Sequence, residues 1–184
     1  MTDQDMRNRP YDTEEVQADD RHFIHPWEVP SAVRTRKNTV IAEGDGIYVR
    51  DSDGNKLMDG PAGMWCVNIG HGRREMADVI ADQVMQLSYV TPWSMTNAPA
   101  ATFAAKLAEI SPGDLNNVFF TTCGSTAVDS AVRFMQYYNN ALGRKSKKQV
   151  ISRMLGYHGS TFVGGSLSGK PLDKDGMDFA AGMT

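Results

Sequence analysis

The chain has 184 residues, with 41% hydrophobic residues, 22% charged residues and a formal net charge of −3 at pH 7. This length predicts one domain, or one domain and part of another, and the composition is that of a globular chain. A net negative charge argues against a general nucleic-acid-binding protein, which needs a basic surface to neutralise phosphates.

Residues 1–20 are polar and charged and show no periodicity. We therefore predict a flexible N-terminal segment without a secretory signal. No apolar run approaches the roughly 20 residues that a membrane-spanning helix needs. Cys66 and Cys123 stand far apart without paired spacing, which is typical of a reducing compartment and argues against a disulfide scaffold or a zinc site. Together these features predict a cytoplasmic protein with no membrane partner.

The region that follows is predicted to contain a β-meander. Three short apolar runs between residues 39 and 60 are separated by glycine-containing turns that suit tight hairpins. Residues 59–72 then form a glycine-rich loop that carries Trp65. Ahead of the meander, His22 and His25 are spaced three apart. No carboxylate or thiolate cluster completes a metal site there, so we interpret both imidazoles as structural.

Two helices are predicted next. From Arg73 onward one apolar stripe runs at helical spacing, and its members are Met76, Val79, Ile80, Val84 and Leu87. A second helix is expected from Asn97, a suitable N-cap with Pro99 in the first turn, to about Ile110. Local signals alone mark both helices.

Strand and helix alternate from residue 118 onward. Residues 118–122 read as a buried strand, a helix begins near Ser125, and a second strand is predicted near residues 149–153. This order indicates an α/β architecture with parallel pairing. Two or three strands cannot form a sheet covered on both faces with the residues present, so the chain reads as the front part of something larger. Basic residues 144–148 are interpreted as a solvated connection.

The turn between the first of these strands and its helix consists of small residues. A helix start leaves N–H groups unpaired and carries partial positive charge. Gly124, Ser125 and Thr126 are therefore suited to holding a phosphate. A simple helix cap explains the same residues, so the turn alone leaves both interpretations open.

A second glycine-rich stretch competes for the role of phosphate loop. Gly164, Gly169 and Lys170 match most of a P-loop. A P-loop needs Ser or Thr after the lysine to hold magnesium, whereas this chain has Pro171. No hydrophobic strand leads into the stretch either. The sequence therefore disfavours a nucleotide-hydrolysing function.

Three stretches together carry a family resemblance: residues 59–76, 118–138 and 151–169. In this order and spacing they resemble the class III (omega) aminotransferases, which are fold-type I pyridoxal-phosphate enzymes. The resemblance runs from about His22 to about Gly169. These elements are far more specific in combination than singly.

The resemblance implies an α/β fold in three parts. Residues 1–20 are the flexible segment, residues 21–72 a small-domain segment with the β-meander, and residues 73–184 the first, incomplete part of the mixed α/β large domain that binds pyridoxal phosphate. In that family the Schiff-base lysine and the Asp that pairs with the pyridine nitrogen lie beyond residue 184. No catalytic residue is therefore assigned, and the chain alone is expected to be inactive.

The implied reaction moves an amino group from an amine or omega-amino acid to a keto acid such as pyruvate. The implied cofactor is pyridoxal 5′-phosphate, which acts as the electron sink, and family members are usually homodimers. An alternative from another class is a non-catalytic remnant that binds a phosphate ligand or a partner chain.

The resemblance also places the cofactor on particular residues. Gly124, Ser125 and Thr126 fall where the family binds the cofactor phosphate, although the family more often has Glu in place of Thr126. Tyr157 falls where an aromatic ring stacks on the pyridine ring; the alternative for a loop tyrosine is half-buried packing. His158 is adjacent and is expected to bind or to brace the loop by hydrogen bonding.

Three tryptophans are candidates for the amine-substrate pocket. Trp65 matches an aromatic residue that lines this pocket in omega-transaminases, and Trp27 and Trp93 occupy aromatic positions near it. The alternative for each is core packing. Three aromatic side chains around a cleft would favour an apolar substituent on the amine.

Overall fold

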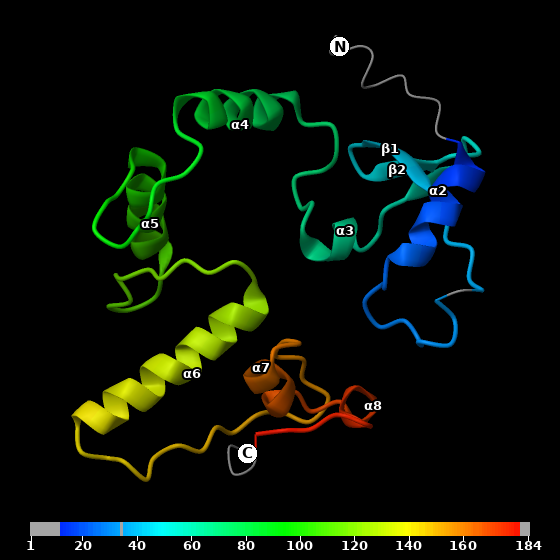
Figure 1. Ribbon diagram of the computed structural model, residues 1–184. Helices are drawn as coiled ribbons and strands as arrows, with labels where there is room; N and C mark the ends of the chain where they lie inside the picture. Colours follow the sequence, from blue (N-terminus) through cyan, green and yellow to red (C-terminus); the bar gives the residue numbers. More distant parts are fainter. Residues whose placement is uncertain (1–11, 34, 181–184) are drawn as a thin grey trace. The chain divides into compact units, whose positions relative to one another are not determined.

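The computed structural model describes residues 12–33 and 35–180. The chain divides into two compact units, Met1–Thr91 and Pro92–Thr184, and Figure 1 shows their helices and strands along the sequence. In the first unit the elements are α2 (Thr13–Asp19), η1 (Asp20–His22), β1 (Ile41–Asp45), β2 (Tyr48–Asp51), β3 (Lys56–Met58), α3 (Ala62–Trp65) and α4 (Arg74–Gln86). The second holds α5 (Ala98–Ile110), α6 (Gly124–Ala141), α7 (Phe162–Leu167) and α8 (Pro171–Lys174).

The first described element is a short helix where the sequence predicted no regular structure. Helix α2 begins after Asp12, whose Oδ1 accepts the backbone N–H groups of Glu14 at 2.9 Å and Glu15 at 3.1 Å. Acidic side chains in a first helical turn also complement its positive end. The remainder of the predicted flexible segment, residues 1–11, lies outside the described residues.

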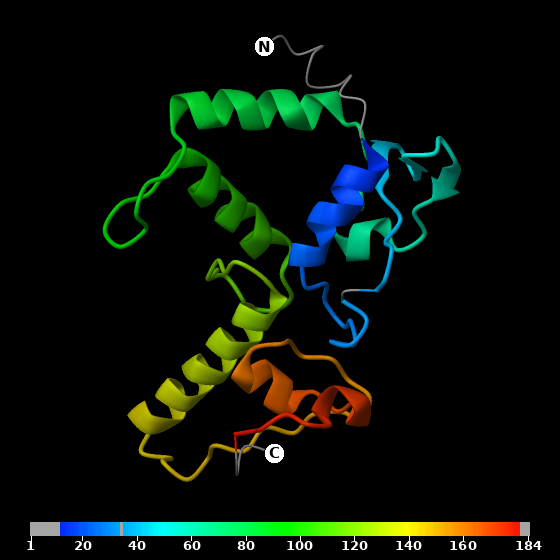
Figure 2. The same ribbon diagram turned by 45° about the vertical axis from the view of Figure 1, so that its right-hand side comes forward.

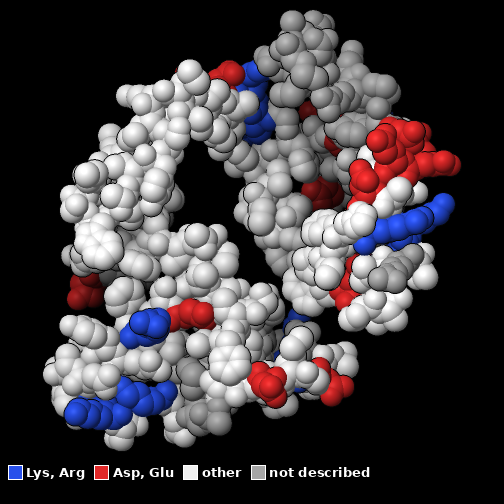
Figure 3. Space-filling view, in the orientation of Figure 1, with Lys and Arg blue, Asp and Glu red and all other residues white. Residues whose placement is uncertain are grey.

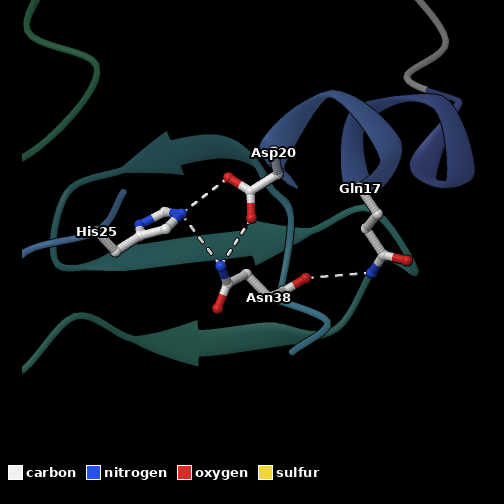
Figure 4. Close-up of polar contacts among 4 residues, drawn as sticks. All are labelled: Gln17, Asp20, His25 and Asn38. Carbon is white, nitrogen blue, oxygen red and sulfur yellow. Dashed lines mark hydrogen bonds and ion pairs between the residues drawn. The ribbon is translucent and has the colours of Figure 1, made fainter. Parts of the chain in front are cut away.

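A polar cluster ties α2 and η1 to the segment that leads into β1, as Figure 4 shows. Asn38 donates from Nδ2 to Asp20 Oδ2 at 2.7 Å, and its carbonyl accepts from Gln17 Nε2 at 3.1 Å. His25 Nε2 lies 2.8 Å from Asp20 Oδ1. Hydrogen bonds from Asn38 and His25 lower the pKa of Asp20. The imidazole of His25 is therefore part of a structural clasp.

The predicted β-meander is confirmed. Strands β1, β2 and β3 form one antiparallel sheet in that order, with Asp45 opposite Tyr48 and Tyr48 opposite Met58. The β1–β2 turn passes through Gly46 at φ 57°, the left-handed region that glycine enters without a steric cost. Each strand therefore begins in or beside one of the predicted runs, and β1 begins only at Ile41, the last residue of the first run.

Both predicted helices of the middle region are also confirmed, as α4 and α5. The side chain of Asn97 caps α5 by accepting the N–H of Ala100 at 3.0 Å, with a proline in the first turn. The apolar stripe of α4 is exposed, including Met76, Val79 and Ile80. In Figure 3 the surface over these two helices shows few charged atoms. Among the described residues, no helix combines the length and hydrophobicity needed to cross a membrane.

In the second unit α6 and α7 lie side by side, as both views of the ribbon show (Figures 1 and 2). The buried residues cluster on these two helices. Val132 and Asn139 are buried on α6, and Ser166 and Leu167 on α7. The hydrogen bonds that join the two elements come from Asp129 of α6, which accepts from Thr161 and from Gly164 of α7.

The two strands predicted beside α6 do not form within the described residues. Residues 118–122 and 149–153 are assigned no strand. Phe119 instead packs edge-to-face against Phe134 of α6, with ring centroids 5.2 Å apart, and Ile151 is 100% exposed. A strand exists only when a neighbour completes its hydrogen bonds, and the described residues supply no such neighbour. The prediction of a parallel pair was wrong for this reason.

Candidate functional site

The start of α6 is built by a reciprocal cap. Cys123 is extended, with φ −164° and ψ 174°. Its N–H donates to Thr126 Oγ1 at 3.2 Å, while that hydroxyl donates to the carbonyl of Cys123 at 2.9 Å. The Cys123 sulfur in turn accepts the backbone N–H of Thr126. The hydroxyl of Thr126, predicted to contact a phosphate, is thus engaged with the cap in this structure.

The same cap surrounds the Cys123 thiol with hydrogen-bond donors. The pKa of the Cys123 thiol is lowered, first by the N–H of Thr126, then by the Thr126 hydroxyl, and also by the N–H and hydroxyl of Ser125. Cys123 is an exposed, free cysteine. A Cβ placed on Gly124 would meet no atom within 4 Å, so an anion can approach the backbone there.

The loop that carries Tyr157 and His158 lies against this helix end. Ser160 donates its N–H to Ser125 Oγ at 3.1 Å. Gly159 has φ 129°, and a Cβ there would lie 2.8 Å from the Cα, Cβ and Oγ of Ser125. The close approach therefore requires glycine. The structure thus brings the predicted phosphate turn and the predicted stacking loop together.

Asp129 fastens the same loop and was not predicted from the sequence. Its Oδ1 accepts from Thr161 Oγ1 at 2.7 Å and from the N–H of Gly164 at 3.1 Å. Asp129 lies four residues after Ser125, one helical turn along the same face of α6. Its position was the signal in the sequence that could have revealed this role. Asp129 lies on the same side of the helix as Val132, which is buried, and an acidic residue on a packed face usually has a partner.

Tyr157 and His158 differ in how they are held. The side chain of Tyr157 is 47% exposed, and Lys170 Nζ lies 5.9 Å from its ring centroid. The backbone N–H of His158 donates to Ser168 Oγ at 2.9 Å. Within the part of the chain that is described, His158 Nε2 is buried and makes no hydrogen bond. The backbone of His158, rather than its Nε2, therefore braces the loop.

The first glycine of the rejected P-loop belongs to a helix, whereas Gly169 lies after the end of that helix. Gly164 lies inside α7, whose N-cap is Thr161. A Cβ on Gly164 would lie 2.7 Å from the carbonyl oxygen of His158. Its lack of a side chain thus permits close packing rather than phosphate binding, because a P-loop places its glycines before the helix.

In the first unit, the glycine-rich stretch 59–72 is a closed surface loop. Asp59 N–H donates to the carbonyl of Ile47 at 2.9 Å, and His71 exchanges two backbone hydrogen bonds with Gly46, at 2.8 and 3.1 Å. His71 Nε2 also lies 2.9 Å from Asp59 Oδ2. Both ends of the loop therefore meet at the β1–β2 turn, which is the arrangement of an Ω-loop.

Trp65 stands on this loop in a left-handed turn. Ala62, Gly63, Met64 and Trp65 have φ values of 49°, 57°, 62° and 65°, a run that costs roughly 1–2 kcal/mol per residue for L-amino acids other than glycine. The pKa of Asp59 is lowered, first by the hydrogen bond from His71 and then by the N–H of Gly63. The Asp59 carboxylate therefore helps hold the strained turn.

The three predicted pocket tryptophans are exposed in this structure. Trp65 is 73% exposed and Trp93 is 94% exposed, and Trp27, at φ 59°, is also exposed. Core packing against the described residues thus does not explain them. Trp27 and Trp65 belong to the first unit and Trp93 to the second.

The comparisons with known proteins agree with one another. The family model described as aminotransferase class-III matches residues 31–183. The putrescine–pyruvate aminotransferase of Pseudomonas aeruginosa is 38% identical over 167 residues, which cover 89% of this chain and 37% of that protein. The diaminobutyrate–2-oxoglutarate transaminase of Halomonas elongata is 41% identical over 140 residues, covering 76% of this chain and 30% of that protein.

Solved structures give the same result. A transaminase from the marine bacterium Virgibacillus matches with a TM-score of 0.88 and 34% identity, over 92% of this chain and 39% of the other. The omega transaminase from Pseudomonas jessenii in complex with PMP matches with a TM-score of 0.87 and 32% identity, over 91% and 38%. The chain therefore spans less than two fifths of the length of these relatives.

Proposed function

The chain belongs to the class III aminotransferases and has part of their fold-type I architecture, and from that premise we propose its role. It is the part of a pyridoxal-phosphate-dependent aminotransferase that binds the cofactor phosphate and supplies one wall of the amine pocket. The observation that carries the proposal is the contact at the start of α6, where Ser160 of the Tyr157 loop donates to Ser125 Oγ at 3.1 Å and the approach to the backbone of Gly124 is open.

The residues present fit a phosphorylated aromatic ligand. The N–H groups and the hydroxyl of Ser125 would hold the phosphate at the positive end of α6. Tyr157, on the loop bonded to Ser125 through Ser160, would stack on the pyridine ring. His158, on the same loop, would contact the cofactor beside Tyr157, and the hydrogen bonds of Thr126 would hold the phosphate turn in its conformation. The bound cofactor would supply an electron sink, while these residues bind and orient it.

The proposed donor is an amine or omega-amino acid, and the proposed acceptor is a keto acid such as pyruvate. The named relatives act on putrescine with pyruvate and on diaminobutyrate with 2-oxoglutarate. Trp65, Trp27 and Trp93 are each proposed to offer apolar surface to the substituent on the amine. The lysine and the Asp that complete the chemistry would come from the part of the family's length that this chain does not span, so the chain alone should not transaminate.

The proposal extends to assembly and compartment. We place the complete enzyme in the cytoplasm as a homodimer. The two free cysteines suit a reducing compartment. The exposed apolar stripe of α4 is surface that a longer chain or a second subunit would cover.

Cys123 provides a direct test of cofactor binding, because its thiol lies at the proposed phosphate site. In a Cys66→Ser variant, the rate of alkylation by iodoacetamide is measured against pH, with and without pyridoxamine 5′-phosphate. This ligand has no aldehyde and cannot form imines with surface lysines. A bound phosphate should compete for the N–H groups, raise the pKa of Cys123 and slow its alkylation.

The matched control is a Cys123→Ser variant, in which only Cys66 reacts. Its alkylation should not respond to the ligand. Equal alkylation of Cys123 with and without millimolar pyridoxamine phosphate would refute the proposed site. Protection by inorganic phosphate to the same degree as by pyridoxamine phosphate would instead favour a remnant that binds only phosphate.

A further inference from the structure

We propose that Asp129 is a positioning residue of the cofactor site: its carboxylate fastens the loop that carries Tyr157 to the same face of α6 that presents the phosphate turn. The inference rests on the proposed function, because it assigns to Asp129 the seating of the stacking ring relative to the phosphate. Asp129 would touch neither ligand nor reacting atoms.

One oxygen atom of Asp129 accepts two hydrogen bonds from the loop. Thr161 donates its hydroxyl to Asp129 Oδ1 at 2.7 Å, and Gly164 donates its backbone N–H to the same oxygen at 3.1 Å. These partners lie 32 and 35 residues away along the chain. Asp129 is half-buried, where a hydrogen bond is less weakened by competition from water. The contact is therefore a tertiary fastening and not a local turn.

The loop depends on such a fastening. Helix α7 has only six residues, too few to be stable without tertiary contacts. Its N-cap, Thr161, accepts the N–H of Gly164 at 3.2 Å while donating to Asp129. Asp129 thus binds both members of this cap, and it does so from the helix whose first turn is the proposed phosphate site.

Two residues of α6 that lie one helical turn apart hold the loop at two points. Ser125 accepts from Ser160, and Asp129, one turn later, accepts from Thr161 and Gly164. Between them, the backbone from Ser160 to Gly164 is fixed along α6. Tyr157 precedes this fixed segment by three residues, and its neighbour His158 donates its N–H to Ser168, just after α7, so moving the segment and α7 would also move Tyr157.

The test compares two variants and two ligands. Asp129→Ala removes the acceptor, whereas Asp129→Asn keeps an amide oxygen that can accept from both donors. Binding of pyridoxamine 5′-phosphate and of inorganic phosphate is measured by calorimetry. The phosphate alone needs only the α6 turn, while the pyridoxamine ring also needs Tyr157. Asp114→Ala is the matched control, because Asp114 is an exposed acidic residue of the same unit.

We expect Asp129→Ala to weaken pyridoxamine phosphate roughly 3- to 10-fold, the scale of one lost aromatic contact, with inorganic phosphate changed less than about twofold. Asp129→Asn should restore most of the preference for the ring, and Asp114→Ala should leave both affinities unchanged. An unchanged preference in Asp129→Ala, or an equal loss in Asp129→Asn, would overturn the inference.

Hydrogen exchange of the ligand-free chain separates this inference from the proposed function. If the wild-type chain binds neither ligand, the proposed function fails. Exchange at Gly164 then still decides the role of Asp129: its N–H should exchange at least about tenfold faster in Asp129→Ala, because its bond to a half-buried carboxylate is lost and only the longer bond to Thr161 Oγ1 remains. Unchanged exchange at Gly164 would refute the positioning role whatever the ligands do.

Discussion

Replacing Gly159 by alanine should detach the Tyr157 loop from α6. The added Cβ would lie 2.8 Å from three atoms of Ser125, at a backbone φ of 129°. Optimal contact between carbon atoms is about 3.5–4.0 Å, so the loop must move by several tenths of an ångström at least. The Ser160 to Ser125 hydrogen bond, now 3.1 Å, would then be stretched or lost.

The expected cost follows from two contributions. A non-glycine residue held in a sparsely populated backbone conformation costs about 1–3 kcal/mol, and a lost hydrogen bond about 0.5–1.5 kcal/mol. The loop contact should therefore weaken by about 2–4 kcal/mol, or roughly 30- to 1,000-fold in its opening equilibrium. Amide hydrogen exchange of peptides that cover residues 157–164, followed by mass spectrometry, measures this opening.

Gly143→Ala is the matched control, because it separates backbone strain from steric contact. Gly143 also has a positive φ of 72°, but a Cβ there would meet no atom within 4 Å. Its cost should be about 1–2 kcal/mol and confined to the end of α6. If Gly159→Ala and Gly143→Ala left exchange in residues 157–164 equally unchanged, the close packing of this loop on Ser125 would be refuted.

Three further predictions concern local stability. Met64→Gly should raise the free energy of opening of the 59–72 loop by about 0.5–1 kcal/mol, seen as slower hydrogen exchange. The substitution removes about 1–2 kcal/mol of left-handed backbone strain, which is offset in part by the entropic cost of glycine. Faster exchange would contradict this. Because the pKa of Asp59 is lowered from 3.8, the stability that its carboxylate gives the 59–72 loop is present above pH 3.8 and is lost as the pH falls through the lowered pKa. Hydrogen exchange of the loop, corrected for the intrinsic pH dependence of exchange, should show this loss of protection, and Asp59→Asn should abolish the pH dependence. Asn97→Ala should destabilise the start of α5 by about 1 kcal/mol, seen as faster exchange in its first turn, whereas Asn116→Ala, outside the helix, should have no such effect there.

Local signals in the sequence predicted most of the regular structure. The meander followed from alternating apolar runs and glycine turns, α4 from its stripe, and α5 from the Asn97 cap. The short α2 was missed because its signal is a single capping side chain, Asp12, ahead of a polar segment. The predicted strands at 118–122 and 149–153 failed because strand pairing depends on neighbours that local sequence does not specify.

The candidate site shows the same division between local and tertiary information. The turn at the start of α6 could be proposed as a phosphate site from sequence because small residues at a helix start leave backbone N–H groups accessible, and that role also stays a prediction. The role of Asp129 could not be proposed, because its partners lie more than thirty residues away. The reciprocal cap that engages Thr126 was equally hidden, since serine, threonine and cysteine can each bond the backbone in several ways. The roles assigned to Tyr157 and the tryptophans stay predictions.

The left-handed turn from Ala62 to Trp65 restricts which residues this loop can evolve or be engineered to contain. At these positions the backbone conformation limits the allowed residues more strongly than the space for the side chain does. Glycine, asparagine and aspartate enter the left-handed region most readily, whereas β-branched residues are strongly disfavoured. In a library of substitutions at Trp65, a position proposed to line the amine pocket, Val, Ile and Thr would therefore be disfavoured by the backbone conformation whatever their size. A mirror-image residue at Met64 would suit the turn better than any natural one.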